Sequence, residues 1–577
     1  MESREDIRNT IEGSQVSSPS GRGEFLVLVI FFVLVMVVSC FPILRHLTWH
    51  LAQEPLGDKG TNLWNLWWVY YALFELNTSP LWCDLIFYPW GCDLRYHTLS
   101  PVNGILAAPI TKWFDANISY NLLFLLWTFL TGVWAACWGR SFHLSLPAAC
   151  ALGVIAALNP FRWQHLNHLN LFSTAWMFLA FWSFERYLET YRKFYVVIFG
   201  TALLLTQYSS WYMGLFSVIY VCIRFVAFLP YREHWQKCIP VFLSLCVCAM
   251  VLSATLVCYF SSPGSVDAPL VLPDDMELQY SIYWSLDLLQ LLFPVWLLQS
   301  LGIPIVQEAE FGLHVGLLLA GLALYTGVVK RKRIKSDNQY LFLILGSVLF
   351  CLFSLGPVLK IGGDIIHPGG SPLFLPAFLM EFIPRLTSIR VFARFSFVGY
   401  MLLCILAFYG MESLFRERKI SPHMTHVIYA GVILIFLLES GWSPPVMVPF
   451  QVRQEDLNKI DGPVLALPYL PTHWSGRHLY LQTIHHQPVY VAEFSRLGRF
   501  KQRYLNQHPA LVQLNEYLFQ TEDVKVEFSY HLPAELQKIG IRTVLLKSPA
   551  QDDEGNPNLE RLELLKSQYP AICFVFY

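Results

Sequence analysis

Long apolar segments alternate with short polar connections over the first 445 residues of the chain. A helix that crosses a bilayer needs about 20 mostly apolar residues, and a scan with a window of roughly that length predicts about eleven spans. We expect these spans near residues 25–44, 118–138, 145–159, 169–185, 194–207, 209–229, 239–260, 312–330, 339–356, 395–415 and 425–441. The pattern predicts an α-helical polytopic membrane protein.

Lysine and arginine residues gather in alternate connections between the predicted spans. One set of connections holds Arg140, Arg186, Arg192, Lys193, Arg232, Lys237, Lys330–Arg333, Arg416, Arg418 and Lys419. By the positive-inside rule this set faces the cytoplasm. The opposite set includes Ser261–Phe311, which contains no Lys or Arg. We therefore expect a multi-pass protein of the plasma (inner) membrane with a cytoplasmic N-terminus.

Three regions follow from the same pattern. Residues 1–23 are polar and predict a disordered cytoplasmic tail, and residues 24–445 form the transmembrane domain with a first outward loop at 45–117. From about residue 446 apolar residues alternate with polar ones, as in GPVLALPYL, QPVYVAEF, TVLLK and AICFVFY. Such runs predict strands, and 522–538 and 558–568 predict helices. We expect residues 446–577 to be a small extracytoplasmic α+β domain.

Composition agrees with a membrane protein and excludes some functions. Hydrophobic residues make up 55% of the chain and charged residues 14%, which is outside the range of ordinary soluble domains. The formal net charge is −1, and no basic domain is present that would bind nucleic acid. Ionisable residues are rare inside the spans, whereas ion-driven transporters place them there. Chemistry at the outer membrane surface is therefore favoured over transport.

The first outward loop carries the acidic candidates in a Trp-rich setting. Asp58 follows the first span and could act as a general base or hold a divalent cation. As an alternative, it could cap a helix over 63–76. Further acidic candidates in the outward loops are Asp84, Asp93, Glu308 and Glu310. Cys83 and Cys92 lie in the same loop and either form a disulfide or remain free thiols.

Basic and aromatic residues accompany these acids in other outward connections. Arg162 and His165 lie in PFRWQHLNHLN, with His168 three residues further on, and could bind phosphate or hydroxyl groups. Alternatively, they anchor a helix end, and no third metal ligand is evident for the two histidines. Tyr208 and Trp211 in QYSSW could stack on a sugar or a lipid headgroup, or belong to an aromatic belt.

Arginines outside a span oppose the positive-inside trend. Arg390 and Arg394 lie in SIRVFARF, just before the span at 395–415. A planar guanidinium pairs bidentately with phosphate. We expect these two residues to bind the phosphate of a lipid-linked substrate; pairing with acidic residues of the preceding outward loop is the alternative.

The order of these motifs resembles the GT-C superfamily of polytopic glycosyltransferases, which use lipid-phosphate-linked sugars on the outer side of a membrane. The chain is more closely similar to a poorly characterised group of bacterial polytopic proteins described as glycosyltransferases. The likeness is carried by GDKGTNLWNLWW, FYPWGCDLRYHTLSP, NPFRWQHLNHLNL, QYSSWYMG, SLGP, SIRVFARF and HWSGRHLYLQTIHHQPVY. It implies a GT-C-like fold and places the first-loop catalytic carboxylate at Asp58. Many members have two adjacent acids there, whereas Lys59 follows here.

The hypothesis from sequence is therefore an inverting glycosyltransferase with Asp58 as its base. The donor would be a polyprenyl-phosphate-linked sugar, and the acceptor a hydroxyl of a glycan, lipid or protein. Arg390 and Arg394 would stabilise the departing phosphate, and His97, Arg162 and His165 would position the substrates. Mg²⁺ or Mn²⁺ is a candidate cofactor, with its ligands undefined. The alternatives are a flippase or export component for lipid-linked glycans and a non-catalytic membrane scaffold.

Overall fold

A computed structural model gives the structure of the protein. It describes residues 22–48, 50–52, 57–95, 97–228, 239–241, 243–245, 248, 274–305, 317–329, 338–366, 389–449, 457, 460–469, 473–492, 498–519, 532–546, 557–568 and 572–576. Most of the predicted span at 239–260, most of the tail at 1–23, and Glu308 and Glu310 lie outside these ranges. The described part is mostly helical, as the sequence predicts.

Each of the remaining ten predicted spans overlaps a helix. The long helices of the bundle are α2 (Arg22–Ser39), α6 (Ala116–Ser141), α7 (Leu146–Ala157), α10 (Ala175–Thr190), α11 (Lys193–Ser209), α12 (Trp211–Phe228), α17 (Leu317–Val329), α18 (Asn338–Ser354), α20 (Ser396–Glu417) and α21 (Pro422–Glu439). Within the described residues, four continuous helical stretches are long and apolar enough to cross a membrane: Ala116–Ser141, Leu146–Gln164, Phe392–Glu417 and Pro422–Glu439. The count of about eleven spans stays a prediction.

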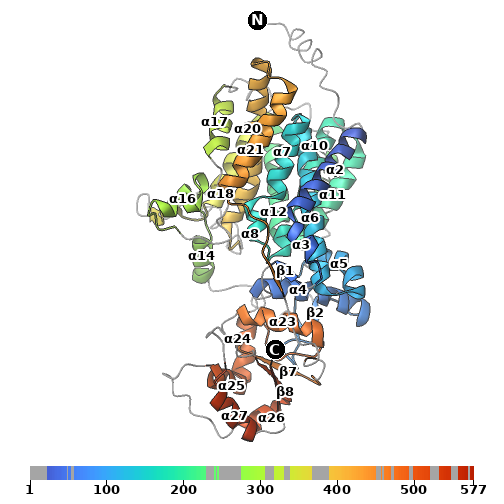
Figure 1. Ribbon diagram of the computed structural model, residues 1–577, viewed down its shortest axis with the longest axis vertical. Coiled ribbons are helices and arrows are strands. Elements are labelled where there is room, and N and C mark those ends of the chain that lie inside the picture. Colours follow the sequence, from blue (N-terminus) through green and yellow to red (C-terminus); the bar gives the residue numbers. More distant parts are fainter. Residues whose placement is uncertain are drawn as a thin grey trace.

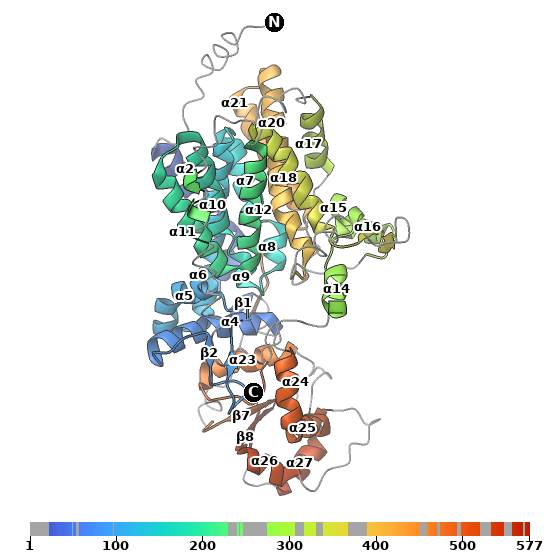
Figure 2. The same cartoon turned by 180° about the vertical axis from the view of Figure 1, so that it is seen from behind.

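Helix α6 lies at the centre of one half of this bundle, where it packs against α2, α7 and α10 (Figures 1 and 2). Phe32 of α2 is fully buried and fits against two glycines, one on α6 and one on α7. A Cβ atom at Gly132 or at Gly153 would come within 2.3 Å of the Phe32 ring. The small residues therefore allow the close approach of these three helices.

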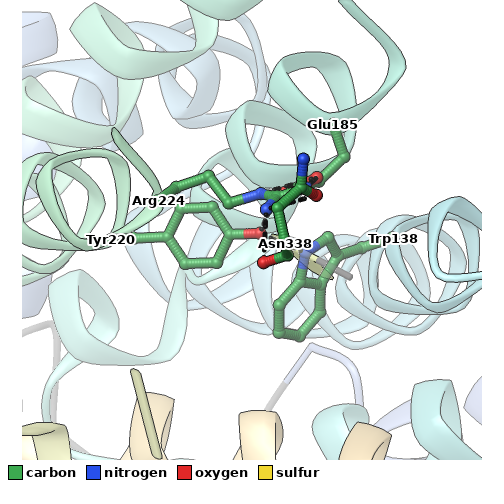
Figure 3. A network of polar contacts seen from close by, with 5 residues as sticks. All are labelled: Trp138, Glu185, Tyr220, Arg224 and Asn338. Carbon is green, nitrogen blue, oxygen red and sulfur yellow. Dashed lines mark hydrogen bonds and ion pairs between the residues drawn. The ribbon is translucent and has the colours of Figure 1, made fainter. Parts of the chain in front are cut away.

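A buried polar network joins α6, α10, α12 and α18 (Figure 3). Arg224 donates from Nε to Glu185 Oε1 at 3.0 Å and from Nη2 to Glu185 Oε2 at 3.1 Å. The Tyr220 hydroxyl donates to the same carboxylate at 2.8 Å and accepts from Trp138 Nε1 at 2.9 Å. Arg224 also donates to the backbone oxygen of Asn338 at 3.1 Å. This ion pair lies within spans that the sequence suggests are almost free of charge.

The first outward loop lies between the helical bundle and the C-terminal region (Figures 1 and 2). Helix α3 (Phe41–Arg45) leads into it, and its elements are β1 (His50–Ala52), α4 (Gly57–Tyr70), the π-helix η1 (Tyr71–Glu75), β2 (Trp82–Cys83), β3 (Cys92–Asp93) and α5 (Pro101–Trp113). Strand β1 pairs with β6 (Met447–Pro449), which leads out of α21. Cys83 and Cys92 are partners across β2 and β3 and are both free, buried thiols in this structure.

Short elements lie at the end of the bundle nearer α4 (Figures 1 and 2). They are α8 (Pro160–Gln164), α9 (Leu169–Phe172), α14 (Asp274–Tyr283), α15 (Leu288–Leu292), α16 (Val295–Ser300), β4 (Leu359–Ile361), β5 (Asp364–Ile366) and the 3₁₀ helix η8 (Phe392–Phe395). Helices α15 and α16 project sideways from the bundle, and α14 lies below them (Figure 2). Asp287 joins this projection to the hairpin of β4 and β5, because its Oδ2 accepts from the Gly363 backbone nitrogen at 2.9 Å.

The C-terminal region contains a parallel sheet with the strand order β7, β8, β9. The strands are Val464–Leu467, Thr543–Leu546 and Cys573–Phe576, and the helices are α23 (His473–His485), α24 (Gly498–Gln507), α25 (Pro509–Phe519), α26 (Leu532–Ile539) and α27 (Leu559–Gln568). Helices that separate parallel strands in sequence define an α/β arrangement, which differs from the α+β domain that the sequence predicts. In the described part of QPVYVAEF, residues 487–492, the predicted strand is reduced to isolated bridges from Val489 to Ile86 and to Val464.

Candidate functional site

Asp58 lies in the first turn of α4, the helix that lies between the bundle and the C-terminal region (Figure 1). Its Oδ2 is 2.9 Å from Nε2 of His168, and the two side chains are 61% and 28% exposed. His168 is the N-cap residue of α9, which joins the second outward connection to the bundle. The pair therefore brings together two predicted motifs that are more than a hundred residues apart in sequence.

The electrostatic surroundings favour an ionised carboxylate at Asp58. Partial removal from water raises the pKa of Asp58, but a hydrogen bond and the charge of His168, followed by the charge of Arg394, outweigh that effect. The resulting pKa lies below the ordinary value for aspartate. Asp58 is consequently a carboxylate at neutral pH, so it accepts hydrogen bonds and can take a proton.

His97 is held beside this carboxylate by Asn65 of α4. The His97 Nε2 atom is 2.8 Å from Asn65 Oδ1, and Asn65 Nδ2 donates to the Thr98 backbone oxygen at 3.1 Å. Because the amide nitrogen is already a donor to Thr98, the amide oxygen accepts and His97 Nε2 carries the proton. Burial lowers the pKa of His97 to about 3, although the charge of Asp58 opposes this. His97 is therefore neutral at physiological pH.

The side chain of Lys59, the residue after Asp58, lies inside the protein. It is fully buried, donates from Nζ to the Leu166 oxygen at 3.2 Å, and lies 3.9 Å from the centre of the Tyr120 ring. The Tyr120 hydroxyl donates to the same Leu166 oxygen at 3.0 Å. Burial holds the pKa of Lys59 well below its ordinary value. Lys59 thus fixes the segment that presents His168 and adds no exposed charge to the site.

The two predicted phosphate ligands lie just before α20. Arg394 belongs to η8, is 9% exposed, and places its guanidinium 4.5 Å from the centre of the Tyr212 ring. Its charge contributes to the lowered pKa of Asp58. Arg390 is half-buried, with its guanidinium 5.7 Å from the centre of the Tyr280 ring on α14. Arg394 is therefore the arginine that acts electrostatically on the Asp58 carboxylate.

A residue that binds substrate must be accessible to it, whereas Arg162 lies inside the bundle. It is fully buried, its guanidinium stacks 3.9 Å from the Phe172 ring, and it donates to the Phe172 oxygen at 3.0 Å and the Trp127 oxygen at 3.2 Å. It also donates to the Ala157 oxygen. Ala157 and Phe172 are the last residues of α7 and α9, where backbone oxygens lack partners within the helix. Arg162 holds the bundle together, and we do not retain it as a substrate ligand.

The remaining predicted ligands have mixed positions. His165 is buried, with Nδ1 at 2.5 Å from the Phe161 oxygen and its ring centre 5.4 Å from that of His168. Tyr208 is half-buried near the end of α11. Trp211 at the start of α12 is 69% exposed, as expected of a residue that faces lipid or solvent. His165 supports the His168 ring, and substrate roles of Tyr208 and Trp211 stay predictions.

Asp84 and Asp93, two of the candidate second acids, bind side chains of their own loop. Asp84 accepts from Trp82 Nε1 at 2.6 Å, and Asp93 forms a buried ion pair with Arg95 that includes an Nε to Oδ1 contact of 2.8 Å. Among the described residues no group of three or more His, Cys, Asp or Glu side chains is arranged to hold a metal ion. Glu308 and Glu310 are outside the described ranges.

The C-terminal region contacts α4 through residues of the HWSGRHLYLQTIHHQPVY motif. Gln482 of α23 accepts from Trp64 Nε1 at 2.7 Å and donates to the Leu85 oxygen at 2.7 Å. His486 stacks on Trp67 with ring centres 5.3 Å apart. Gly476 packs against Gly57, the residue before Asp58. The HWSGRHLYLQTIHH motif therefore forms the interface with the helix that carries the candidate base.

Replacement of Gly476 by alanine tests this close contact. A Cβ atom at Gly476 would lie 2.0 Å from the Gly57 backbone oxygen, so either α23 or the start of α4 must move. Overpacking of this kind costs about 1–3 kcal/mol, and we expect a lower midpoint of thermal unfolding. Gly431→Ala is the matched control, because no atom lies within 4 Å of the added Cβ in helix α21. Equal midpoints in the two variants would contradict the packing.

Three comparisons with known proteins complete this description. No protein-family model matches the chain, and no curated protein matches it. Among solved structures, the oligosaccharyltransferase of Archaeoglobus fulgidus in its apo form is similar, with a TM-score of 0.45 and 10% identity, over 82% of this chain and 65% of that one. The same enzyme, AglB, in complex with an inhibitory peptide and a dolichol-phosphate gives a TM-score of 0.46 at 10% identity, over 81% and 64%.

The arabinofuranosyltransferase AftD from Mycobacteria is a further structural neighbour, with a TM-score of 0.49 and 15% identity. The match covers 83% of this chain and 32% of AftD. The chain thus spans about two thirds of the archaeal enzyme and about one third of the mycobacterial one. Because every TM-score is below 0.5, function is argued below from the residues of this chain.

Proposed function

We propose that this protein is a membrane glycosyltransferase that transfers a sugar from a polyprenyl-phosphate-linked donor to an acceptor hydroxyl at the outer membrane surface. The observation that carries the proposal is the exposed, ionised carboxylate of Asp58, paired with His168 and influenced by the charge of Arg394. A carboxylate, a basic group for a leaving phosphate and flanking apolar helices are the components that this reaction needs.

In the proposed reaction the hydroxyl oxygen of the acceptor forms a bond to the anomeric carbon of the donor. Asp58 takes the proton of that hydroxyl as the bond forms. The bond from that carbon to the phosphate oxygen breaks, and its electron pair leaves with the polyprenyl phosphate. A single displacement of this kind inverts the anomeric configuration. The hydroxyl becomes more acidic as the new bond forms, so a carboxylate with a lowered pKa is basic enough to accept its proton.

Each neighbouring residue has a part in this proposal. His168 orients the Asp58 carboxylate through the 2.9 Å contact. Arg394 stabilises the charge that develops on the departing phosphate, together with Arg390, which lies beside Tyr280 of α14. Neutral His97 donates from Nε2 to Asn65 and so keeps its ring beside Asp58 without adding positive charge. A bound Mg²⁺ or Mn²⁺ ion remains a candidate cofactor, for which Asp58 would be one oxygen ligand.

An assay with purified protein in liposomes tests the proposal. We expect release of polyprenyl phosphate when the protein is given a polyprenyl-phosphate sugar and a glycan acceptor, with and without added Mg²⁺ or Mn²⁺. The sugar is transferred only if the phosphate bond breaks, so bond cleavage distinguishes an enzyme from a flippase. Movement of the intact lipid between leaflets would instead favour the flippase, and neither event would favour a scaffold. Both of those results contradict the proposal.

A further inference from the structure

Cys83 and Cys92 lie opposite each other in the hairpin that β2 and β3 form in the first outward loop. They are register partners across the antiparallel pair, and each has at most 1% of its surface exposed. The neighbouring residue Trp82 is 42% exposed. Successive side chains of a strand point to opposite faces, and directly opposite partners share a face. Both cysteine side chains therefore lie on the buried face of the hairpin.

The backbone of the hairpin brings the two cysteines within the reach of a disulfide bond. Directly opposite residues of an antiparallel pair have Cα atoms about 4.5–5.5 Å apart, and disulfide-bonded cysteines have Cα atoms about 4.4–6.8 Å apart. Gly91 lies close to the other strand, because a Cβ atom there would come within 3.1 Å of the Cys83 backbone oxygen. A bond between the two sulfur atoms is therefore compatible with the pairing of the strands.

The electrostatic surroundings show that the two thiols act on each other. Burial raises the pKa of the Cys83 thiol well above its ordinary value, and the charge of a thiolate at Cys92 raises it further. Burial also raises the pKa of Cys92, and the charge of Asp93 adds to this. Only the thiolate form reacts readily. A bond between these residues would therefore form while the chain folds, before the C-terminal region covers the hairpin.

The residues between the two cysteines bind the C-terminal region, and we name residues 84–91 the docking loop. The Leu85 backbone oxygen accepts from Gln482 Nε2 at 2.7 Å and from the Val489 backbone nitrogen at 2.8 Å. The Tyr88 backbone nitrogen donates to the Val489 oxygen at 3.1 Å. The docking loop therefore binds the segment of the C-terminal region that follows α23.

Aromatic side chains of the docking loop also pack against α24. The Phe87 ring centre is 5.1 Å from that of Phe500 and 5.4 Å from that of Tyr504. The Trp90 ring centre is 5.2 Å from that of Tyr504, whose hydroxyl donates to the Tyr88 backbone oxygen at 2.5 Å. All of these contacts lie between the two cysteines in sequence, so a bond between the cysteines would close the loop that makes them.

We propose that Cys83 and Cys92 form a disulfide bond that closes the docking loop and so holds the C-terminal region against the first outward loop. The proposal depends on the outward position of this loop that the sequence predicts, because disulfides form and persist in oxidising compartments outside the cytoplasm. The bond stabilises the docked arrangement by restricting the conformations that the opened loop can adopt. It is independent of the reaction proposed above.

The bond would form by thiol–disulfide exchange with an oxidised dithiol protein of the same compartment. A thiolate of one cysteine attacks the disulfide of that protein and forms a mixed disulfide, and the thiolate of the other cysteine then displaces the partner. The two cysteines lose two protons and two electrons in total. These reduce the disulfide of the partner to two thiols, so atoms and electrons balance.

Mass spectrometry of the full-length protein tests for the bond. The protein is produced in a bacterium with an oxidising periplasm, and its thiols are blocked with N-ethylmaleimide in denaturant at lysis. Cleavage before aspartate separates the two cysteines, because Asp84 and Asp93 directly follow them. We expect Cys83 and Cys92 in one cross-linked pair of peptides, which separates when dithiothreitol reduces the bond.

Other buried thiols serve as the internal control for the blocking reaction. Cys137 on α6 and Cys404 on α20 are buried thiols of the bundle. They should carry the blocking group with and without reduction. Blocked thiols at Cys83 and Cys92 in the unreduced sample overturn the proposal, as does a bond from either residue to a different cysteine.

Limited digestion with chymotrypsin tests what the bond holds in place. This protease cuts after aromatic residues, and those of the docking loop are protected while the loop is packed against the C-terminal region. We expect cleavage in the docking loop to be about tenfold faster in Cys83→Ala/Cys92→Ala than in the wild-type protein, because loss of the link favours the open loop and cleavage follows the population of the open form. New peptide ends are counted after reduction.

Cys137→Ala/Cys404→Ala is the matched control for the digestion, since it also removes two buried thiols, and it should be cut in the docking loop at the wild-type rate. Equal rates in the two double variants overturn the role of the bond in docking. Neither measurement depends on sugar transfer, so a negative result here leaves the proposed glycosyltransferase reaction to its own assay.

Discussion

Asp58→Asn is expected to reduce sugar transfer by about 10²–10⁴-fold, the contribution typical of a general base. Asparagine has nearly the same shape as aspartate, so it can still hydrogen-bond to His168, but it cannot take the proton of an acceptor hydroxyl. The change also removes the negative charge beside His97 and Arg394. The measurement is the initial rate of polyprenyl phosphate release by protein reconstituted in liposomes, with saturating donor.

Asp115→Asn provides the control for this variant. Asp115 is the N-cap of α6 in the same outward loop, where its Oδ1 accepts from the Ile118 backbone nitrogen at 2.7 Å. Asparagine serves as well as aspartate at an N-cap, so transfer should be unchanged. Both variants should elute as a single monodisperse species. Full activity of Asp58→Asn would remove the base from the proposed mechanism.

The site was only partly predictable from the sequence. Asp58 and Arg394 are identifiable because a charge is unusual beside apolar, aromatic segments at a membrane surface. The spacing of His165 and His168 indicated that the second outward connection mattered, but it could not tell which histidine meets Asp58. That contact depends on the turn between α8 and α9, which a helical periodicity does not describe.

Arg162 illustrates why a residue type alone does not assign a role. Its sequence context, an arginine near a predicted interface, is the same whether it binds phosphate or the protein. The backbone carbonyls of Ala157, Phe172 and Trp127 become its partners only when α6, α7 and α9 pack together. Such long-range contacts arise from tertiary packing, so single-sequence patterns do not show them.

In the C-terminal region the sequence predicts the strands but not how they pair. Its strands in GPVLALPYL, TVLLK and AICFVFY follow from alternating apolar residues and are confirmed as β7, β8 and β9. Their parallel order does not follow from alternation. The bridge between Val489 and Ile86, which joins the sheet to the first outward loop, links segments about four hundred residues apart. Hydrophobic periodicity gives the elements, whereas their partners depend on the folded chain.

The buried ion pair of Glu185 and Arg224 is the clearest departure from the sequence interpretation. Both residues lie within predicted spans, where the chain otherwise has few charges, and each is at most 2% exposed. The carboxylate also receives a hydrogen bond from Tyr220, and Arg224 reaches the start of α18 at Asn338 (Figure 3). Because all these groups are partnered within the protein, the pair joins helices and has no evident part in moving ions.

Arg224→Met is therefore expected to destabilise the protein by about 3–5 kcal/mol, since it leaves the Glu185 charge buried without its partner. The double variant Glu185→Gln/Arg224→Met should recover most of that loss, because it removes both charges while glutamine can still accept from Tyr220. Arg186→Met is the control: Arg186 pairs with Glu189, whose side chain is 31% exposed, and such a pair contributes less than about 1 kcal/mol. Thermal unfolding in detergent micelles, followed by tryptophan fluorescence, measures all three. A midpoint of Arg224→Met equal to that of Arg186→Met would show that the network does not hold the four helices together.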